Sequence, residues 1–285
     1  MTKLNRPIRI RFANLCEPTC KFMERAQYIV CLCTGLFLAA CASQPTGAPG
    51  SAAGADEQSS RASKDVIDAT GLAAYYPFNG SARDQSSNGN HGTVHGGNFI
   101  ADRLGRPSGA YALNGVDNYI SVAGSKSLEA EFELSIAVWL YHKTQKSDKE
   151  WYSIVEKSDP ERWGHSKYGM WLIRDLVEFC IQPIDLSLPH RCLDSETTLQ
   201  PEQWHHLVGV NDGRVLRLYI NGQPAGEKAF DSRTDTSRSD FELYIGTDLY
   251  DASPVYAKGA VDELRVYMRA LSPSEVVTLF QSEHR

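Results

Sequence analysis

Short segments of alternating apolar and polar residues, separated by turn signals, dominate the sequence from residue 71 onward. An alternation of period two is typical of strands that bury one face. Two turn signals are sharp, Asn-Asp-Gly at residues 211–213 and Asn-Gly at residues 221–222, because these residues tolerate the positive φ that tight hairpins require. The pattern predicts strands at residues 72–78, 109–114, 118–122, 132–141, 152–156, 168–173, 176–182, 204–210, 214–220, 241–246 and 258–268.

One segment has the signature of a helix. Ser272 precedes Pro273, and Glu275 stands three residues after Ser272, which is the arrangement of a capping box with proline in the first turn. Elsewhere, the nearly unbroken apolar run of residues 134–140 predicts a strand covered on both faces. Many short strands followed by one terminal helix predict an all-β fold, a two-sheet antiparallel β-sandwich with one short C-terminal helix.

The N-terminal region has the pattern of an export signal. Residues 28–40 form an apolar run that is too short to cross about 30 Å of hydrocarbon as a helix but has the length of a signal-peptide core. The sequence Leu-Ala-Ala-Cys that ends at Cys41 resembles a bacterial lipobox, which implies cleavage before Cys41 and lipid attachment to its thiol. We therefore expect a signal peptide within residues 1–40, and the alternative is a buried helix with a stray cysteine. Residues 1–22 would make an unusually long segment before the apolar run, which favours Met23 as the true start, and Met1 is the alternative.

Residues 41–70 are rich in Ala, Ser, Gly and Pro. Such a segment cannot bury enough apolar surface to offset its chain entropy, so we expect a flexible tether that begins at the lipidated Cys41. The protein is then anchored in a bacterial cell envelope. The residue after Cys41 is Ala42 rather than Asp, which resembles sorting to the outer membrane of a Gram-negative cell. The outer face of the plasma membrane is the alternative.

The charge of the chain excludes one class of partner. The whole sequence carries a formal charge of −6 at pH 7, and its first 40 residues are net basic, so the remainder is more acidic still. Binding to nucleic acid needs Lys and Arg side chains that displace phosphate counterions. We therefore expect no nucleic-acid partner.

Two cysteines remain beyond the tether, Cys180 and Cys192. An isolated pair in an exported domain predicts a disulfide bond, and a reduced buried pair is the alternative.

Several motifs occur in the order in which they are found in laminin-G-like, concanavalin A-like modules. The chain resembles the opening of these modules at residues 71–80, 84–92 and 112–120, their central hairpin at residues 203–208 and 218–222, and their closing strand at residues 259–267 and 269–272. The resemblance spans residues 71–282 and implies that residues 71–285 fold as a jelly roll of two curved antiparallel sheets.

The resemblance also implies a structural calcium ion that pins the loop after the first strand to the last strand. Its ligands would be Asp84 and Asp262, with Asn79, Gly80 and Asn88 as further candidates. Calcium takes about six to eight oxygen ligands, which short Asp and Asn side chains and turn carbonyls supply. The alternative is that Asp84 only starts a turn through hydrogen bonds to its own backbone, while Asp262 forms a local salt bridge.

Aromatic side chains in the predicted loops are candidates for a carbohydrate site, because aromatic faces stack on sugar rings. The candidates are Trp151, Tyr152, Trp163, His165, Tyr250 and Tyr256, and the alternative for each is packing beneath a loop. Trp139, Trp171 and Trp204 stand within strand patterns and are assigned to the core.

Motifs of known catalytic sites do not occur in the sequence. Glucanases that share this fold resemble one another in a Glu-x-Asp-x-x-Glu strand, which places two carboxylates about 5 Å apart, and no such strand occurs here. Asp262 and Glu263 would point to opposite faces of a strand, and so would His205 and His206. We expect a binding module for glycan or another surface polymer and no enzyme. A protein-binding or adhesion module is the first alternative, and a glycoside hydrolase or lyase is the second.

Overall fold

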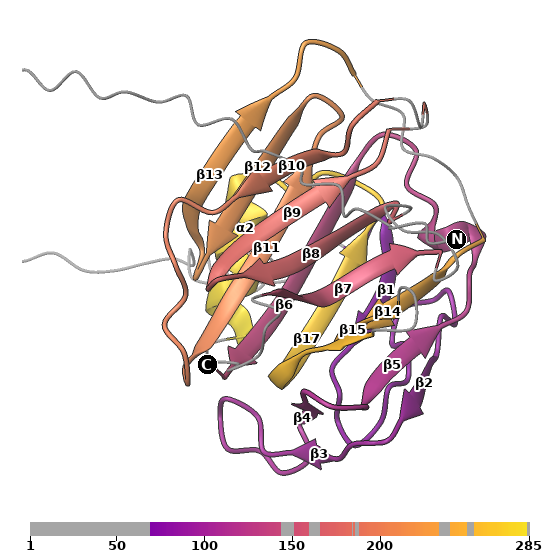
Figure 1. Cartoon of the computed structure of the whole chain (residues 1–285), viewed down its shortest axis with the longest axis vertical. Helices are drawn as coiled ribbons and strands as arrows, with labels where there is room; N and C mark the ends of the chain where they lie inside the picture. Colours follow the sequence, from indigo (N-terminus) through magenta and orange to yellow (C-terminus); the bar gives the residue numbers. More distant parts are fainter. Residues whose placement is uncertain are drawn as a thin grey trace, which may run out of the picture. The chain divides into compact units, whose positions relative to one another are not determined.

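The structure, a computed structural model, describes residues 69–143, 151–159, 166–183, 185, 188–233, 240–249 and 254–283. Within these residues the chain forms two packed antiparallel sheets and one C-terminal helix, as the sequence predicts (Figure 1). No helix in these ranges is long and apolar enough to cross a bilayer.

One sheet has eight strands that come from the whole length of the described chain. Its members are β1 (Leu72–Tyr76), β3 (Phe99–Ile100), β4 (Ala110–Asn114), β6 (Leu134–His142), β11 (Trp204–Asn211), β12 (Val215–Ile220), β13 (Gln223–Ala229) and β17 (Lys258–Tyr267). They lie in the order β13-β12-β11-β6-β17-β4-β3, and β1 also pairs with β17. The first and last strands of the domain are therefore neighbours.

The other sheet has seven strands and faces the viewer in Figure 1. Its members are β2 (Gly92–His95), β5 (Tyr119–Val122), β7 (Trp151–Ser158), β8 (Tyr168–Ile173), β9 (Leu176–Ile181), β10 (Arg191–Asp194) and β14 (Glu242–Ile245). They lie in the order β10-β9-β8-β7-β14-β5-β2. A separate two-stranded sheet joins β15 (Thr247–Asp248) to β16 (Val255–Tyr256).

Each predicted strand is confirmed, but the structure adds several that the alternation did not predict. These are β2, β3, β10, β13, β15 and β16, together with the 3-10 turn η1 (Lys126–Leu128). The strand β13 shows the reason. It lies at the sheet edge with most of its side chains exposed, so its sequence, Gln-Pro-Ala-Gly-Glu-Lys-Ala, needs no apolar alternation. The Asn-Gly turn before it is confirmed, because Asn221 and Gly222 both have positive φ.

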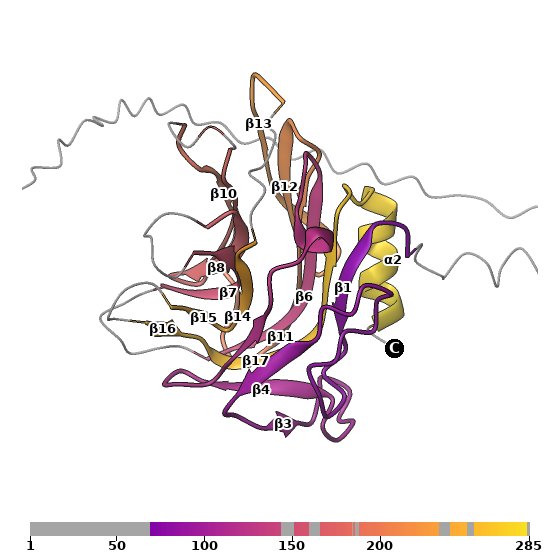
Figure 2. The same ribbon diagram turned by 90° about the vertical axis from the view of Figure 1, so that its right-hand side faces the viewer.

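The main core lies between the two sheets, and a second apolar layer lies behind the eight-stranded sheet. The central strand β6 contributes to both, because Val138 and Leu140 belong to the main core while Ala137 belongs to the second layer. The prediction that residues 134–140 are covered on both faces is therefore confirmed. The helix α2 (Pro273–Glu283) covers this second layer, and Figure 2 shows it on the side away from the seven-stranded sheet.

The N-terminus of α2 is fixed by the predicted capping box. The backbone N–H of Ser272 donates to Glu275 Oε2 at 2.8 Å, and the N–H of Glu275 donates to Ser272 Oγ at 3.3 Å. Two backbone N–H groups at the helix start thus gain acceptors. The helix then buries Val276 and Leu279 against the sheet.

Candidate functional site

The outer surface of the seven-stranded sheet carries a concentration of aromatic and acidic side chains. Successive side chains of a strand point to opposite faces, so residues that alternate with core residues point away from the sandwich. In β8, for example, Met170 and Leu172 lie in the main core, which turns Trp171 outward. We call this surface the front face; its side chains include Tyr119, Glu156, Trp171, Glu178, Asp194, Glu242 and Tyr244.

The centre of the front face is a hydrogen-bonded pair. Trp171 Nε1 donates to Glu156 Oε2 at 2.9 Å, and Ser158 Oγ donates to Glu156 Oε1 at 2.8 Å. Burial and, after it, the charge of the nearby Asp248 raise the pKa of Glu156 to about 8, although the hydrogen bonds from Ser158 and Trp171 lower it. Glu156 is therefore mostly protonated at pH 7 and can donate a hydrogen bond as well as accept one.

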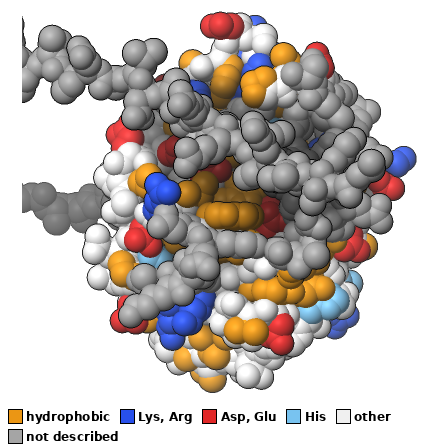
Figure 3. Space-filling view, viewed as in Figure 1, with side chains coloured by type: hydrophobic (Ala, Val, Ile, Leu, Met, Phe, Trp, Pro, Cys, Tyr) orange, Lys and Arg blue, Asp and Glu red, His pale blue; other side chains and the backbone are white. Residues whose placement is uncertain are grey.

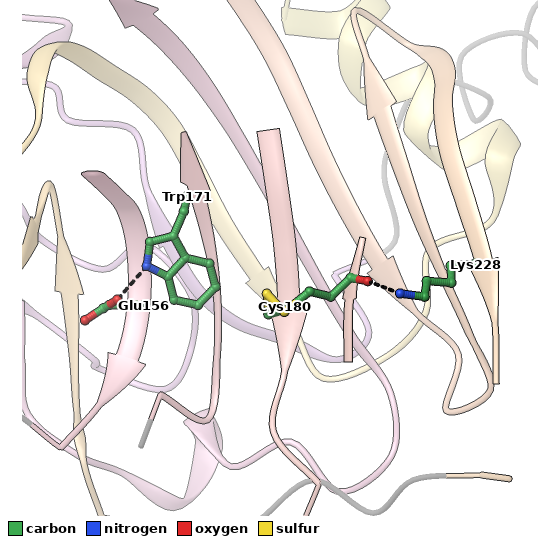
Figure 4. The surroundings of a disulfide bond; sticks show 5 residues. Glu156, Trp171, Cys180 and Lys228 are labelled. Atoms are coloured by element: carbon green, nitrogen blue, oxygen red, sulfur yellow. Dashed lines mark hydrogen bonds between the residues drawn. A yellow bond between two sulfur atoms is a disulfide. The ribbon is translucent and has the colours of Figure 1, made fainter. Parts of the chain in front are cut away.

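A glycine makes room for the Trp171 ring. Gly169 lies two residues earlier on the same face, and a Cβ atom at this position would approach the Trp171 ring to 2.7 Å. The indole therefore lies over the backbone of its own strand. Figure 4 shows it between Glu156 and a disulfide bond.

The disulfide bond joins Cys180 of β9 to Cys192 of β10, as predicted from the isolated cysteine pair. It is also tied to the other sheet, because Lys228 Nζ donates to the backbone carbonyl of Cys192 at 3.0 Å (Figure 4). Among the described residues, the Glu178 carboxylate and the two sulfur atoms are the one group with metal-ligand spacing. The sulfurs are bonded to each other, however, and do not act as thiolate ligands in this state.

Two carboxylates extend the front face from Trp171 toward the sheet edge at β10. Glu178 is the cross-strand partner of both Trp171 and Asp194. Burial raises the pKa of Glu178, and the charge of Asp194 raises it further. This part of the face therefore offers hydrogen-bond acceptors and negative charge.

Aromatic rings continue the front face toward β5 and β2. His95 stacks on Tyr119 with ring centroids 4.2 Å apart, and His95 Nε2 lies 2.9 Å from Ser121 Oγ. The Tyr119 ring also lies 6.4 Å from Tyr244 and 6.2 Å from Tyr256. Figure 3, drawn in the same view as Figure 1, shows hydrophobic side chains in the hollowed centre of the molecule, with acidic side chains nearby.

The aromatic residues that were predicted to bind carbohydrate lie in different surroundings in the structure. Tyr256 reaches the front face through its contact with Tyr119. Tyr152 does not line a ligand surface, contrary to the prediction; it is 4 % exposed and belongs to the main core, because the alternation along β7 turns it inward. Trp151 packs partly buried against the same core. The candidates Trp163, His165 and Tyr250, like Met23 and the lipidation site Cys41, lie outside the described residues.

Trp171 is buried, as its strand pattern predicts, but it lies on the front face. It is only 8 % exposed, but it does not belong to the core between the sheets. The alternation of Tyr168, Met170 and Leu172 was the signal that could have placed it on the opposite face. Trp139 is buried as predicted, beneath α2, where its Nε1 donates to Glu283 Oε2 at 2.7 Å. Trp204 is partly buried with its ring 5.6 Å from Tyr141.

The predicted calcium ligand Asp84 is occupied by hydrogen bonds. Its Oδ1 accepts from the N–H groups of Tyr75 and Ser86 at 2.9 and 2.8 Å. Its Oδ2 accepts from Ser86 Oγ at 2.7 Å and from the N–H of Asn90 at 2.8 Å. These contacts match the turn-forming role that was the alternative to calcium binding.

The second predicted ligand, Asp262, forms a buried ion pair with Arg103 beneath α2. Burial raises the pKa of Asp262 to about 7, although the Arg103 charge lowers it. The Arg103 guanidinium also lies over the Trp139 ring at 4.6 Å. A guanidinium in direct contact with Asp262 opposes a divalent cation at the same carboxylate.

The remaining calcium candidates are Asn79, Gly80 and Asn88. Asn79 and Gly80 are exposed, and Asn88 Nδ2 donates to the backbone carbonyls of Leu72 and Ala73 at 2.9 and 3.1 Å. As arranged, these side chains do not fit the calcium site shared by Asp84 and Asp262 that the family resemblance implies.

Regular alternation predicts that Asp262 and Glu263 point to opposite faces of the strand, but in the structure both point toward the helix side. A β-bulge in the pairing of β17 with β6 falls between Asp262 and Arg265, and Glu263 has a φ of 51°. The extra residue turns Glu263 toward the helix side, where it accepts from Arg265 Nη2 at 2.8 Å and from Tyr75 Oη at 2.7 Å. The buried network beneath α2 is therefore built on an irregularity that the sequence pattern does not contain.

The two neighbouring histidines do alternate across β11. His206 is fully buried beneath α2, 3.7 Å from Glu283 Oε2, while His205 Nε2 lies 2.9 Å from the carbonyl of Gln200. Burial and, after it, the charges of Arg265 and Arg103 lower the pKa of His206 to about 3. His206 is therefore a neutral packing residue, as expected from its strand position.

Comparison with known proteins identifies the family of this chain. Residues 114–277, more than half of the chain, match the family described as the concanavalin A-like lectin/glucanases superfamily. Among curated proteins, no relative matches this sequence.

Solved structures with a similar fold include three with binding roles in their names. Domain 4 of the extracellular arabinanase AbnA from Geobacillus stearothermophilus, in complex with arabinotriose, has a TM-score of 0.55 and 22% identity over 74% of this chain and 98% of its own. The binding domain of Paraclostridial mosquitocidal protein 1 has a TM-score of 0.59 and 18% identity over 75% of this chain and 52% of its own. The botulinum neurotoxin serotype D ligand-binding domain, in complex with N-acetylneuraminic acid, has a TM-score of 0.57 and 13% identity over 75% and 51%.

The chain thus spans nearly all of the arabinanase domain but about half of the two toxin domains. At these identities the structural likeness shows the fold alone, and the family match over the strands that build both sheets shows the membership. This chain belongs to the concanavalin A-like lectin/glucanase superfamily.

Proposed function

We propose that this protein is a glycan-binding module, displayed at a bacterial cell envelope by a lipid on Cys41, and that the front face is its binding surface. The observation that carries the proposal is the Trp171–Glu156 pair, which sets an indole and a mostly protonated carboxyl side by side on the outside of the sheet.

The chemistry of the front face suits a sugar. Ligand sites combine apolar or aromatic surface with a few polar groups that fix orientation. Tyr119 and the exposed edge of Trp171 supply aromatic surface for the C–H face of a sugar ring, while Glu178 supplies an acceptor for its hydroxyl groups. Arabinotriose and N-acetylneuraminic acid are bound by two proteins of similar fold, which supports glycans as the ligand class to test first.

A glycan array probed with the full chain tests the proposal. We expect glycan binding that Trp171→Ala reduces at least tenfold. Trp204→Ala is the matched control, because Trp204 belongs to the other sheet, where its ring packs against Tyr141. Circular dichroism would show that both variants remain folded. Binding that survives in Trp171→Ala and is lost in Trp204→Ala would move the site away from the front face.

Further measurements separate glycan binding from the two alternative functions, protein adhesion and catalysis. Binding to envelope proteins without any binding to glycans would favour an adhesion module. We also propose binding without turnover, so incubation with bound polysaccharides should release no new reducing ends. Release of reducing ends that Glu156→Gln abolishes would instead establish a glycoside hydrolase or lyase.

The lipid anchor is a separate part of the proposal and rests on the sequence around Cys41. Mass spectrometry of the protein purified from bacterial membranes should find a mature N-terminus at a diacylglycerol-modified Cys41. Cys41→Ala should move the protein into the soluble fraction. An unmodified Cys41 in the membrane-derived protein would refute the anchor.

A further inference from the structure

We infer that the front face selects neutral glycans and discriminates against glycans that carry carboxylate groups. This specificity rests on the proposed function and concerns the same site, but it depends on a different property, the charge of the face.

The strand residues of the front face are acidic, and Lys228 of β13, whose ammonium group reaches the edge of the face, donates to the backbone carbonyl of Cys192. By the alternation that defines the face, its acidic members are Glu156, Glu178, Asp194 and Glu242. Among the described residues of the seven strands, no Lys or Arg points outward. An anionic sugar would therefore meet negative or neutral side chains on this sheet.

The cations that do belong to these strands are directed elsewhere. Lys157 is the cross-strand partner of the core residue Tyr168, and its Nζ donates to the carbonyl of Phe241. Arg191 pairs with the core residue Ile181, and Arg191 Nη1 donates to the carbonyl of Ser232 at 2.8 Å. Neither ammonium nor guanidinium group is placed to pair with a ligand on the front face.

Lys167, just before β8, follows the same pattern. Its side chain is only 5 % exposed, and its Nζ lies 5.0 Å from the centroid of the Phe241 ring. This cation–π contact holds the charge at the end of the sandwich rather than beside Trp171.

Recognition of a carboxylated sugar generally uses Arg or Lys, because charge-assisted hydrogen bonds offset the desolvation of the carboxylate. On the front face, the ligand carboxylate would lose its water and approach Glu178 and Asp194. A neutral sugar meets the opposite situation, because its hydroxyl groups donate hydrogen bonds to these carboxylates.

The direct pairing of Glu178 with Asp194 also favours a neutral ligand. Like charges at opposite positions of neighbouring strands destabilise a sheet, so this pair raises the free energy of the unliganded protein. Hydroxyl groups that donate to both carboxylates would reduce the repulsion, whereas a third carboxylate would increase it.

A glycan array printed in two versions tests the inference. One version carries native neutral and carboxylated glycans, and in the other the carboxylates have been reduced to alcohols. On the native array we expect neutral glycans to give the strongest binding. Reduction should increase the binding of formerly carboxylated glycans at least tenfold and leave the neutral glycans unchanged.

A charge variant tests whether the front face causes the discrimination. The double variant Glu178→Gln/Asp194→Asn should narrow the difference between native and reduced glycans to less than threefold. Glu227→Gln on β13 removes a charge from the other sheet, where Glu227 pairs with Arg217, and should leave the difference unchanged. High salt should also narrow the difference, because it screens charges at the surface.

The outcomes are distinct. Native carboxylated glycans that bind as well as or better than their reduced forms would overturn the inference while leaving glycan binding intact. An unchanged difference in the double variant would also overturn it. The absence of binding on both arrays would refute the proposed function itself, and the inference with it.

Discussion

Trp171 Nε1 donates a hydrogen bond of 2.9 Å to the carboxyl group of Glu156, whose side chain is fully buried although it belongs to the outer face of a sheet. The register explains the contact, because Glu156 is paired with Gly169, and the missing side chain of this glycine lets the indole lie beside the carboxyl group. The pair links the stability of the domain to its proposed binding surface.

The first prediction concerns pH. Burial raises the pKa of Glu156 from its ordinary 4.5 to about 8, so between these values the folded protein holds a proton that the unfolded chain has lost. The contribution of Glu156 to stability is therefore greatest below about pH 4.5 and falls as pH rises toward 8. Glu156→Gln removes the titration, and its stability relative to the natural protein should rise with pH by up to about 1.4 kcal/mol per pH unit.

Urea unfolding at several values between about pH 5 and pH 8 measures this difference. A stability difference between the two proteins that stays constant over this range would show that Glu156 is already ionised in the folded state.

A second prediction concerns the ion pair beneath α2. Arg103→Met leaves Asp262 buried without its cation, and the loss of one partner of a buried pair costs about 3–5 kcal/mol. The cost should be smaller at low pH, because Asp262, whose pKa burial raises to about 7, takes up a proton more readily than an exposed aspartate.

The double variant Arg103→Met/Asp262→Asn is the control for this prediction. It removes the unpaired charge and should be more stable than Arg103→Met by at least about 1 kcal/mol near pH 8. A double variant no more stable than the single one would assign the loss to the packing of Arg103 on Trp139 instead.

The disulfide bond should contribute measurably to stability. Cys180 and Cys192 are 12 residues apart, and closing a loop of this size in the unfolded chain stabilises a protein by about 3 kcal/mol. Cys180→Ser/Cys192→Ser should lower the free energy of unfolding by this amount, and dithiothreitol should lower that of the natural protein equally. A reductant effect that persists in the double variant would trace the loss to another cause.

Calcium should not change the melting temperature. Both oxygens of Asp84 accept hydrogen bonds, and Asp262 is paired with Arg103, so neither carboxylate is placed as a free ligand. Thermal unfolding with calcium and with a chelator should give the same midpoint. A rise of several degrees with calcium that disappears in Asp262→Asn would instead establish the calcium site that the family resemblance implies.

The sequence predicts the fold well because its signals are local. Alternation identifies most of the strands that contribute to the main core, and the contacts of Ser272 with Glu275 begin the helix where the capping box predicts. Edge strands such as β13 escape this reasoning, because a strand with few buried side chains needs no apolar alternation.

The candidate site is harder to predict because it depends on the order of the strands in space. Trp171 stands in a strand pattern, but its position on the front face beside Glu156 follows from the pairing of β7 with β8, which no local pattern contains. Tyr152 was predicted to line a ligand surface because it stands at the end of a predicted strand, but it belongs to the main core. The bulge at Glu263 likewise arises from the pairing of β17 with β6, which the sequence pattern does not predict.

The most direct test of the glycan-binding front face is a ¹⁵N spectrum of the tryptophan indole groups, recorded while a glycan selected from the array is added. The chain has five tryptophans, so each indole signal can be assigned by single Trp→Phe substitutions. We expect the Trp171 signal to shift with the binding curve while those of Trp139 and Trp204 do not. A saturable shift of Trp204 or Trp139 with an unmoved Trp171 signal would contradict a glycan-binding front face.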